Sequence, residues 1–232
     1  MEVRSPDRWD AGCEGDSIRN DFVVPFLAKV IRNAQADVVG DIGCGTGYIT
    51  REVARHLHPS RVDWHLLDHD DGMLTYARSH CADLEGAHFH RFDLCVENRA
   101  TQLPDFALGF VAYAFLDIEV NKQVASNTAK LIRPEGLLLL FTPDVLEDVI
   151  QMSGQRPELL DEYRRGVCSF KKLDKFTQTD VTFRANRMEA LLEFFVSAGF
   201  QLLHVEKHQA TGDKRHYAFV LKKTTNALSL LS

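Results

Sequence analysis

VVGDIGCGTGYIT, residues 38–50, is the stretch that decides the fold of this chain. Its first five residues are mostly apolar and β-branched, which is typical of a parallel strand covered on both faces. Gly43, Gly45 and Gly47 follow, and they allow a tight turn and the close approach of a ligand. Apolar side chains then recur at helical spacing as far as Leu57. A strand, a glycine turn and a helix in this order predict a nucleotide-like ligand at the carboxyl end of the strand.

The spacing of these glycines differs from that of a dinucleotide-binding turn, G-x-G-x-x-G. Here the pattern is D-x-G-x-G-x-G, and Asp41 lies inside the strand, where its carboxylate would repel a pyrophosphate. A second carboxylate, Asp68, ends the next apolar stretch, Val62–Asp68, and can accept hydrogen bonds from the hydroxyls of a ribose. Asp70 and Asp71 compete for that role, but the position at the end of the strand favours Asp68.

Taken together, these two stretches resemble the first two motifs of the class I S-adenosylmethionine-dependent methyltransferases. The second motif is carried by Asp68, then Met73-Leu74, then Ala77-Arg78. The resemblance covers residues 36–142 closely and 184–222 loosely. It implies an α/β fold with a doubly wound, seven-stranded, mainly parallel sheet of Rossmann-like type, whose last strand is antiparallel.

The resemblance also implies that the cofactor is S-adenosyl-L-methionine. The cofactor-binding residues that it implies are Asp41, Gly43, Cys44, Gly45, Gly47, Asp68, His69, Met73, Asp93, Leu94 and Ala112. In the family, an acid at the position of Asp93 contacts the adenine amino group. A turn or helix-capping role is the alternative for this residue.

The whole chain, 1–232, is interpreted as a single methyltransferase domain. A loose arm at 1–16 is expected to lead into an N-terminal helix that Asp16 or Ser17 caps and that starts or kinks at Pro25. The region 1–35 then precedes a cofactor-binding core at 36–142, in which Asp71 is a plausible cap for the helix that begins near Met73. Residues 143–183 are predicted as a largely helical lid or substrate-specificity insert, with packing or dimer contact as the alternative. A helix and two closing strands follow at 184–224.

Composition and charge favour a cytoplasmic protein with a small-molecule acceptor. The net charge is −6, and no cluster of lysine and arginine exceeds a pair, which argues against a nucleic-acid partner. The chain has no apolar run of about 18 residues, so no membrane helix is expected, and its polar, acidic start is unlike a secretory signal. Five cysteines without a C-x-x-C pair indicate free thiols in a reducing compartment.

No metal site is expected from the histidines. His56 and His58, like His88 and His90, lie two residues apart, but neither pair has a carboxylate or thiol in an arrangement that dictates a metal. The oligomeric state is expected to be a monomer or a homodimer.

Methyl transfer from a sulfonium requires mainly that nucleophile, methyl group and sulfur are held in line. A base is needed only when the acceptor carries its proton at neutral pH, so no catalytic motif is obligatory. Position along the chain gives four candidates, Tyr113, Asp117, His69 and His216, for each of which packing, capping or surface exposure is the alternative.

Two other classes of function remain open from the sequence. An NAD-dependent oxidoreductase is opposed by the glycine spacing and by the lack of a Tyr-x-x-x-Lys pair. A non-catalytic sensor or accessory protein that binds the cofactor would retain Asp41, Gly43 and Asp68 but lose the acceptor pocket.

Overall fold

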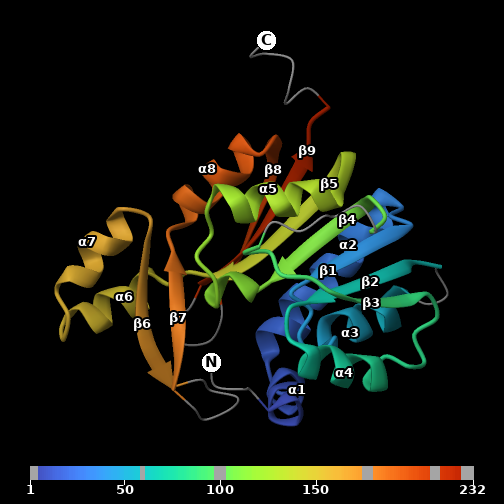
Figure 1. Cartoon of the computed structure of the whole chain (residues 1–232), viewed down its shortest axis with the longest axis horizontal. Coiled ribbons are helices and arrows are strands. Elements are labelled where there is room, and N and C mark those ends of the chain that lie inside the picture. Colours follow the sequence, from blue (N-terminus) through green and yellow to red (C-terminus); the bar gives the residue numbers. More distant parts are fainter. Residues whose placement is uncertain (1–4, 58–60, 97–102, 174–179, 210–214, 226–232) are drawn as a thin grey trace.

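A seven-stranded sheet forms the centre of the protein (Figure 1), in a computed structural model that describes residues 5–57, 61–96, 103–173, 180–209 and 215–225. The strand order is β3-β2-β1-β4-β5-β9-β8. The strands are β1 (Val38–Ile42), β2 (Asp63–Asp68), β3 (Ala87–Arg91), β4 (Phe106–Ala112), β5 (Ile132–Pro143), β8 (Phe200–Gln209) and β9 (Arg215–Lys223). The first five pair in parallel, whereas β9 pairs antiparallel with both β5 and β8. The predicted fold class is confirmed.

Helices cover both faces of the sheet, as a doubly wound sheet requires. On one face, α2 (Val24–Ala34) and α3 (Tyr48–Leu57) pack on β1, β4 and β5, and α4 (Asp71–His80) contacts β2 and β3. On the other face, α5 (Lys122–Leu131) and α8 (Met188–Ser197) pack on β4, β5 and β9 (Figure 1). Because both faces are buried, the central strands are almost wholly apolar.

The region after β5 forms a unit with its own small core. It comprises α6 (Leu146–Ser153), α7 (Glu158–Arg164) and a separate antiparallel pair of strands, β6 (Val167–Leu173) and β7 (Asp180–Asn186), which lie beside the main sheet (Figure 1). Its core includes Val149, Leu159 and Phe170. Asn186 anchors the unit to the loop after β4, because its side-chain amide donates to Phe115 O at 2.7 Å and Ile118 O at 3.0 Å. A lid or specificity role for this insert stays a prediction.

The prediction of a loose arm at the N-terminus was wrong. Residues Pro6–Glu14 form a helix, α1, in which Pro6 supplies the fixed φ favoured at a first turn. Polar composition suggested a loop, but Asp10 and Cys13 of this helix are buried. A π-helical segment, Arg19–Val23, then leads into α2, which begins beside Pro25 as expected.

One local prediction also needs correction. The cap of α4 is Asp70, not Asp71, because Asp70 Oδ1 accepts from the backbone N–H groups of Gly72 and Met73 at 2.7 and 3.1 Å. In β5, which begins at Ile132, residues 133–136 bulge out of the register with β4. Among the described residues, no helix is both long and apolar enough to cross a bilayer.

Candidate cofactor and acceptor site

The glycine turn after β1 is fastened to the end of β2. The backbone N–H groups of Gly43 and Cys44 both donate to Leu67 O, at 2.7 and 2.9 Å. Gly43 has a φ of +79°, and a Cβ added there would lie 2.5 Å from the Cβ of Ala114, just after β4. Glycine is therefore required by both backbone conformation and close packing. The turn holds the carboxyl ends of β1, β2 and β4 together.

Asp68 is the carboxylate at the centre of this edge. Its Oδ2 accepts from Gly45 N at 2.8 Å, its Oδ1 accepts from Asp70 N at 2.9 Å, and His69 Nδ1 lies 3.3 Å from Oδ1. Burial acts to raise the pKa of Asp68, but the hydrogen bonds from His69 and the two backbone groups outweigh it, so the pKa lies below its ordinary value. The carboxylate is ionised and retains acceptor capacity for hydroxyl groups.

His69 shares this environment. The hydrogen bond with Asp68 raises the pKa of the His69 imidazole, although partial burial acts in the opposite direction. Its side chain is half exposed, beside the strand end. The structure thus places His69 with the cofactor candidates rather than with the other catalytic candidates.

Asp41 lies deeper, within β1. Its Oδ2 accepts from Thr50 Oγ1 at 2.6 Å, and only 2% of the residue is exposed. Burial raises its pKa to about 7, although the Thr50 hydrogen bond lowers it. This contact ties α3 to β1, and a direct contact of Asp41 with the cofactor stays a prediction.

The remaining cofactor candidates lie at the same edge of the sheet. Met73 is buried in the first turn of α4, and Leu94 is buried after β3. Asp93 Oδ1 accepts from Cys95 N at 2.8 Å, so Asp93 does make the turn contact that was its alternative role. Ala112 is the last residue of β4. Because carboxyl ends of parallel strands meet at one edge, the candidates converge there.

Tyr113 and His216 meet beside this edge. The Tyr113 hydroxyl lies 3.3 Å from His216 Nδ1, and the two rings are edge-on with centroids 5.9 Å apart. Tyr113 has a φ of +65°, and its N–H donates to Phe141 O at 3.1 Å. Burial raises the pKa of the Tyr113 hydroxyl well above its ordinary value, so it stays protonated at neutral pH.

The fourth catalytic candidate, Asp117, follows the short 3-10 helix Ala114–Leu116, and its backbone N–H donates to Ala114 O at 3.1 Å. The structure therefore brings three of the four candidates into close contacts, His69 with Asp68 and Tyr113 with His216. It places Asp117 at the end of a helical turn.

The N-terminal region adds charged and aromatic groups that the sequence analysis missed. The Arg19 guanidinium pairs with Asp16 and lies over the rings of Tyr113 and Trp9, 4.7 and 5.6 Å from their centroids. A Cβ at Gly45 would lie 3.5 Å from Trp9 Nε1. No local pattern reveals the contacts with Tyr113 and Gly45, because those residues lie far along the chain from Arg19 and Trp9.

A bound cofactor is compatible with the polar groups of the turn. Thr46 is 1% exposed, and its Oγ1 makes no hydrogen bond among the described residues. Buried hydroxyls ordinarily have a partner from protein, water or ligand. The Asp68 carboxylate suits ribose hydroxyls, and the three glycines of the turn have no Cβ atom that would hinder a ligand.

The doubly wound sheet with an antiparallel β9, the glycine turn after β1 and the carboxylate ending β2 define the class I S-adenosylmethionine-dependent methyltransferases. Residues 41–138 match the family described as "Methyltransferase domain". This match and the fold support a class I S-adenosylmethionine-dependent methyltransferase with S-adenosylmethionine as its cofactor.

One curated relative is the malonyl-[acyl-carrier protein] O-methyltransferase of Halalkalibacterium halodurans. It is 27% identical over 162 residues, which are 66% of this chain and 58% of the relative. This chain thus spans little more than half the length of that relative.

Solved structures share the fold. The PH0226 protein of Pyrococcus horikoshii is 16% identical with a TM-score of 0.65, and the match covers 89% of this chain and 90% of that one. The N-methyltransferase NodS of Bradyrhizobium japonicum, solved with S-adenosyl-L-homocysteine, is 14% identical with a TM-score of 0.54, over 81% and 78% of the two chains.

Proposed function

We propose that this protein transfers the methyl group of S-adenosylmethionine to a small-molecule acceptor bound between the glycine turn and the Tyr113–His216 pair. The observation that carries the proposal is the position of that pair. Tyr113 directly precedes Ala114, whose Cβ lies against Gly43 of the turn, and its hydroxyl lies 3.3 Å from His216. Two hydrogen-bonding side chains therefore lie next to the turn that would hold the cofactor.

The residues of the chain act mainly by positioning. Asp68 holds ribose hydroxyls, and the turn that it braces fixes the cofactor relative to β4. When bound, S-adenosylmethionine supplies a methyl group on a positively charged sulfur that leaves as a neutral thioether. Tyr113, protonated because it is buried, donates a hydrogen bond, and His216 accepts one.

The acceptor atom decides whether His216 also acts as a base. A hydroxyl or an ammonium group must lose a proton, which an imidazole can accept. A carboxylate needs no base, and then Tyr113 and His216 only orient the acceptor. The relative named above acts on malonyl-[acyl-carrier protein] as an O-methyltransferase, so a malonyl thioester is the first acceptor to test.

The test measures release of S-adenosylhomocysteine with a panel of hydroxyl, amine and carboxylate acceptors that includes the malonyl thioester. Tyr113→Phe and His216→Gln are compared with the wild type, and His204→Gln on the exposed strand β8 is the control. If His216 is a base, its loss reduces turnover about 10²- to 10⁴-fold while the affinity for S-adenosylmethionine, measured by calorimetry, stays within twofold. Cofactor binding without turnover across the panel would favour the alternative of a non-catalytic sensor or accessory protein.

A further inference from the structure

An aspartate and three histidines gather on one face of the edge strand β3 and its neighbour β2, away from the cofactor edge. Asp63 and His65 lie two residues apart on β2 and therefore point to the same face. His88 is the register partner of His65 on β3, and His90 follows it on the same face. The pairing of β2 with β3 thus brings the Asp63 carboxylate to His88 and His90, which the sequence shows only as a pair of histidines two residues apart.

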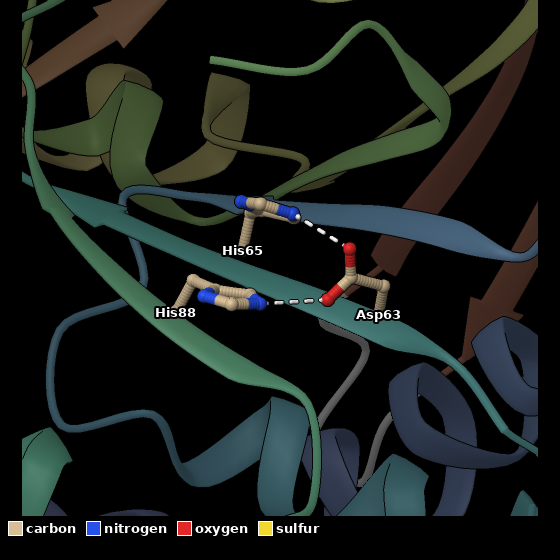
Figure 2. Close-up of side chains that lie close together, drawn as sticks. All are labelled: Asp63, His65 and His88. Atoms are coloured by element: carbon tan, nitrogen blue, oxygen red, sulfur yellow. Dashed lines mark hydrogen bonds and ion pairs between the residues drawn. The ribbon is translucent and has the colours of Figure 1, made fainter. Parts of the chain in front are cut away.

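The side chains already converge (Figure 2). Asp63 bridges the two rings, with Oδ1 2.9 Å from His88 Nε2 and Oδ2 3.3 Å from His65 Nε2. The two imidazole rings are stacked, with centroids 4.8 Å apart and an interplanar angle of 21°. One ligand atom from each of the three residues lies within 4.8 Å of the others. Small rotations of the side chains would bring these atoms around a single ion.

The surroundings support a built site rather than a chance surface contact. His65 is 5% exposed, and its second nitrogen, Nδ1, lies 2.9 Å from His90 Nε2. Histidines that bind metals commonly have their other ring nitrogen hydrogen-bonded, which fixes the ring orientation. The side chains of Asp63 and His88 are 45% and 52% exposed, so an ion can enter from solvent.

We propose that Asp63, His65 and His88 bind a divalent transition-metal ion of the Zn²⁺ type, with His90 as the residue that positions His65. Two imidazole nitrogens and one carboxylate oxygen are ligands suited to Zn²⁺ and Co²⁺ rather than to Mg²⁺ or Ca²⁺. Three protein ligands leave a fourth coordination position for water.

The location gives the ion a structural role. Asp63 begins β2, and Asp68 ends it, so the two lie five residues apart, or about 17 Å at a rise of 3.3 Å per residue. An ion there lies far from the acceptor and joins the edge strand β3 to β2. Because it binds the folded state, it stabilises that state in proportion to its concentration and affinity.

The test uses the full chain without an affinity tag, treated with chelator and dialysed. Co²⁺ is titrated while the visible absorption is recorded, Zn²⁺ is then added in competition, and thermal unfolding is measured with each ion and with Mg²⁺. We expect one Co²⁺ per chain, displacement by Zn²⁺, and a rise in the unfolding temperature with Zn²⁺ but not with Mg²⁺.

Variants separate this site from other histidines. His88→Ala is expected to weaken Co²⁺ binding at least about 100-fold, the upper end of what loss of an outer-shell partner costs, and His90→Ala about 10- to 100-fold. His204→Ala is the matched control, because His204 is also on an edge strand, 54% exposed, and 2.9 Å from a carboxylate, that of Glu206. Circular dichroism checks that each variant is folded, and His88 is exposed enough for alanine to be tolerated.

Three results would overturn the proposal. The first is no uptake of Co²⁺ or Zn²⁺ by the wild type. The second is equal affinity in the His88→Ala and His204→Ala variants. The third is an intense sulfur-to-cobalt charge-transfer band, which would show that cysteine thiolates hold the ion. None of these results depends on methyl transfer, so the proposal and the proposed function can fail separately.

Discussion

Replacing Asp68 with alanine tests the cofactor site most directly. The change removes a carboxylate that accepts from Gly45 N of the glycine turn at 2.8 Å and from Asp70 N, just after β2, at 2.9 Å. It also removes the acceptor for the ribose hydroxyls. A hydrogen bond to a charged group contributes about 1.5–3 kcal/mol, so the loss of even one weakens S-adenosylmethionine binding at least tenfold, or about 1.4 kcal/mol.

Calorimetric titration with S-adenosylmethionine and S-adenosylhomocysteine measures this loss. Asp71→Ala is the matched control, since it removes a nearby carboxylate that is 70% exposed and lies 3.5 Å from Arg91 Nε. We expect its affinity to stay within twofold of the wild type. Asp68→Asn keeps the shape of the side chain and serves if the alanine variant unfolds. Wild-type affinity in a folded Asp68 variant would refute the assignment of Asp68 to the ribose.

Three further predictions concern stability. Gly43→Ala places an alanine in a left-handed backbone conformation and in close contact with Ala114, so it should lower the unfolding free energy, measured by urea titration, by about 2 kcal/mol. The control, Gly15→Ala, has no neighbour nearer than 4.0 Å and should change the unfolding free energy little. Burial raises the folded-state pKa of Asp41 from 3.8 to about 7, so the native state holds a proton that the unfolded chain has lost. The wild type should therefore lose stability relative to Asp41→Asn as the pH rises through that interval, with no further change above it, and parallel pH profiles would contradict this. Arg19→Ala breaks a buried ion pair with Asp16 and should lower the unfolding free energy by about 3 kcal/mol, whereas the double variant Arg19→Met/Asp16→Leu should recover most of that loss. Equal stability of the single and double variants would argue against a contribution from the ion pair.

The parallel core of this protein is predictable from its sequence because its signals are local. The strand, glycine turn and helix of residues 38–57 need only neighbouring residues to be recognised, and Asp68 is recognised by its place at a strand end. The order of the strands and the antiparallel β9 came from the resemblance to a family, since local patterns carry no information on strand pairing.

The errors in prediction have a common physical cause. The segment 6–14 is polar along the chain, but in the folded protein its Asp10 is buried and pairs with Arg51 at 3.1 Å, 41 residues further on. Asp70 and Asp71 are indistinguishable as caps until the turn geometry selects one. The cluster around Asp63 depends on strand register in the same way. Each of these features arises from contacts that form only when the chain is folded.

The position of β9 has a consequence for folding during synthesis. β9 lies between β5 and β8, although both of those strands are made before it. Until residues 215–223 leave the ribosome, the backbone groups of β5 that pair with β9 have no partner. For the same reason β8 has no strand with which to pair. An unpaired strand edge is open to association with other chains. The nascent protein therefore stays most exposed to chaperones, and to aggregation, until β9 has been made.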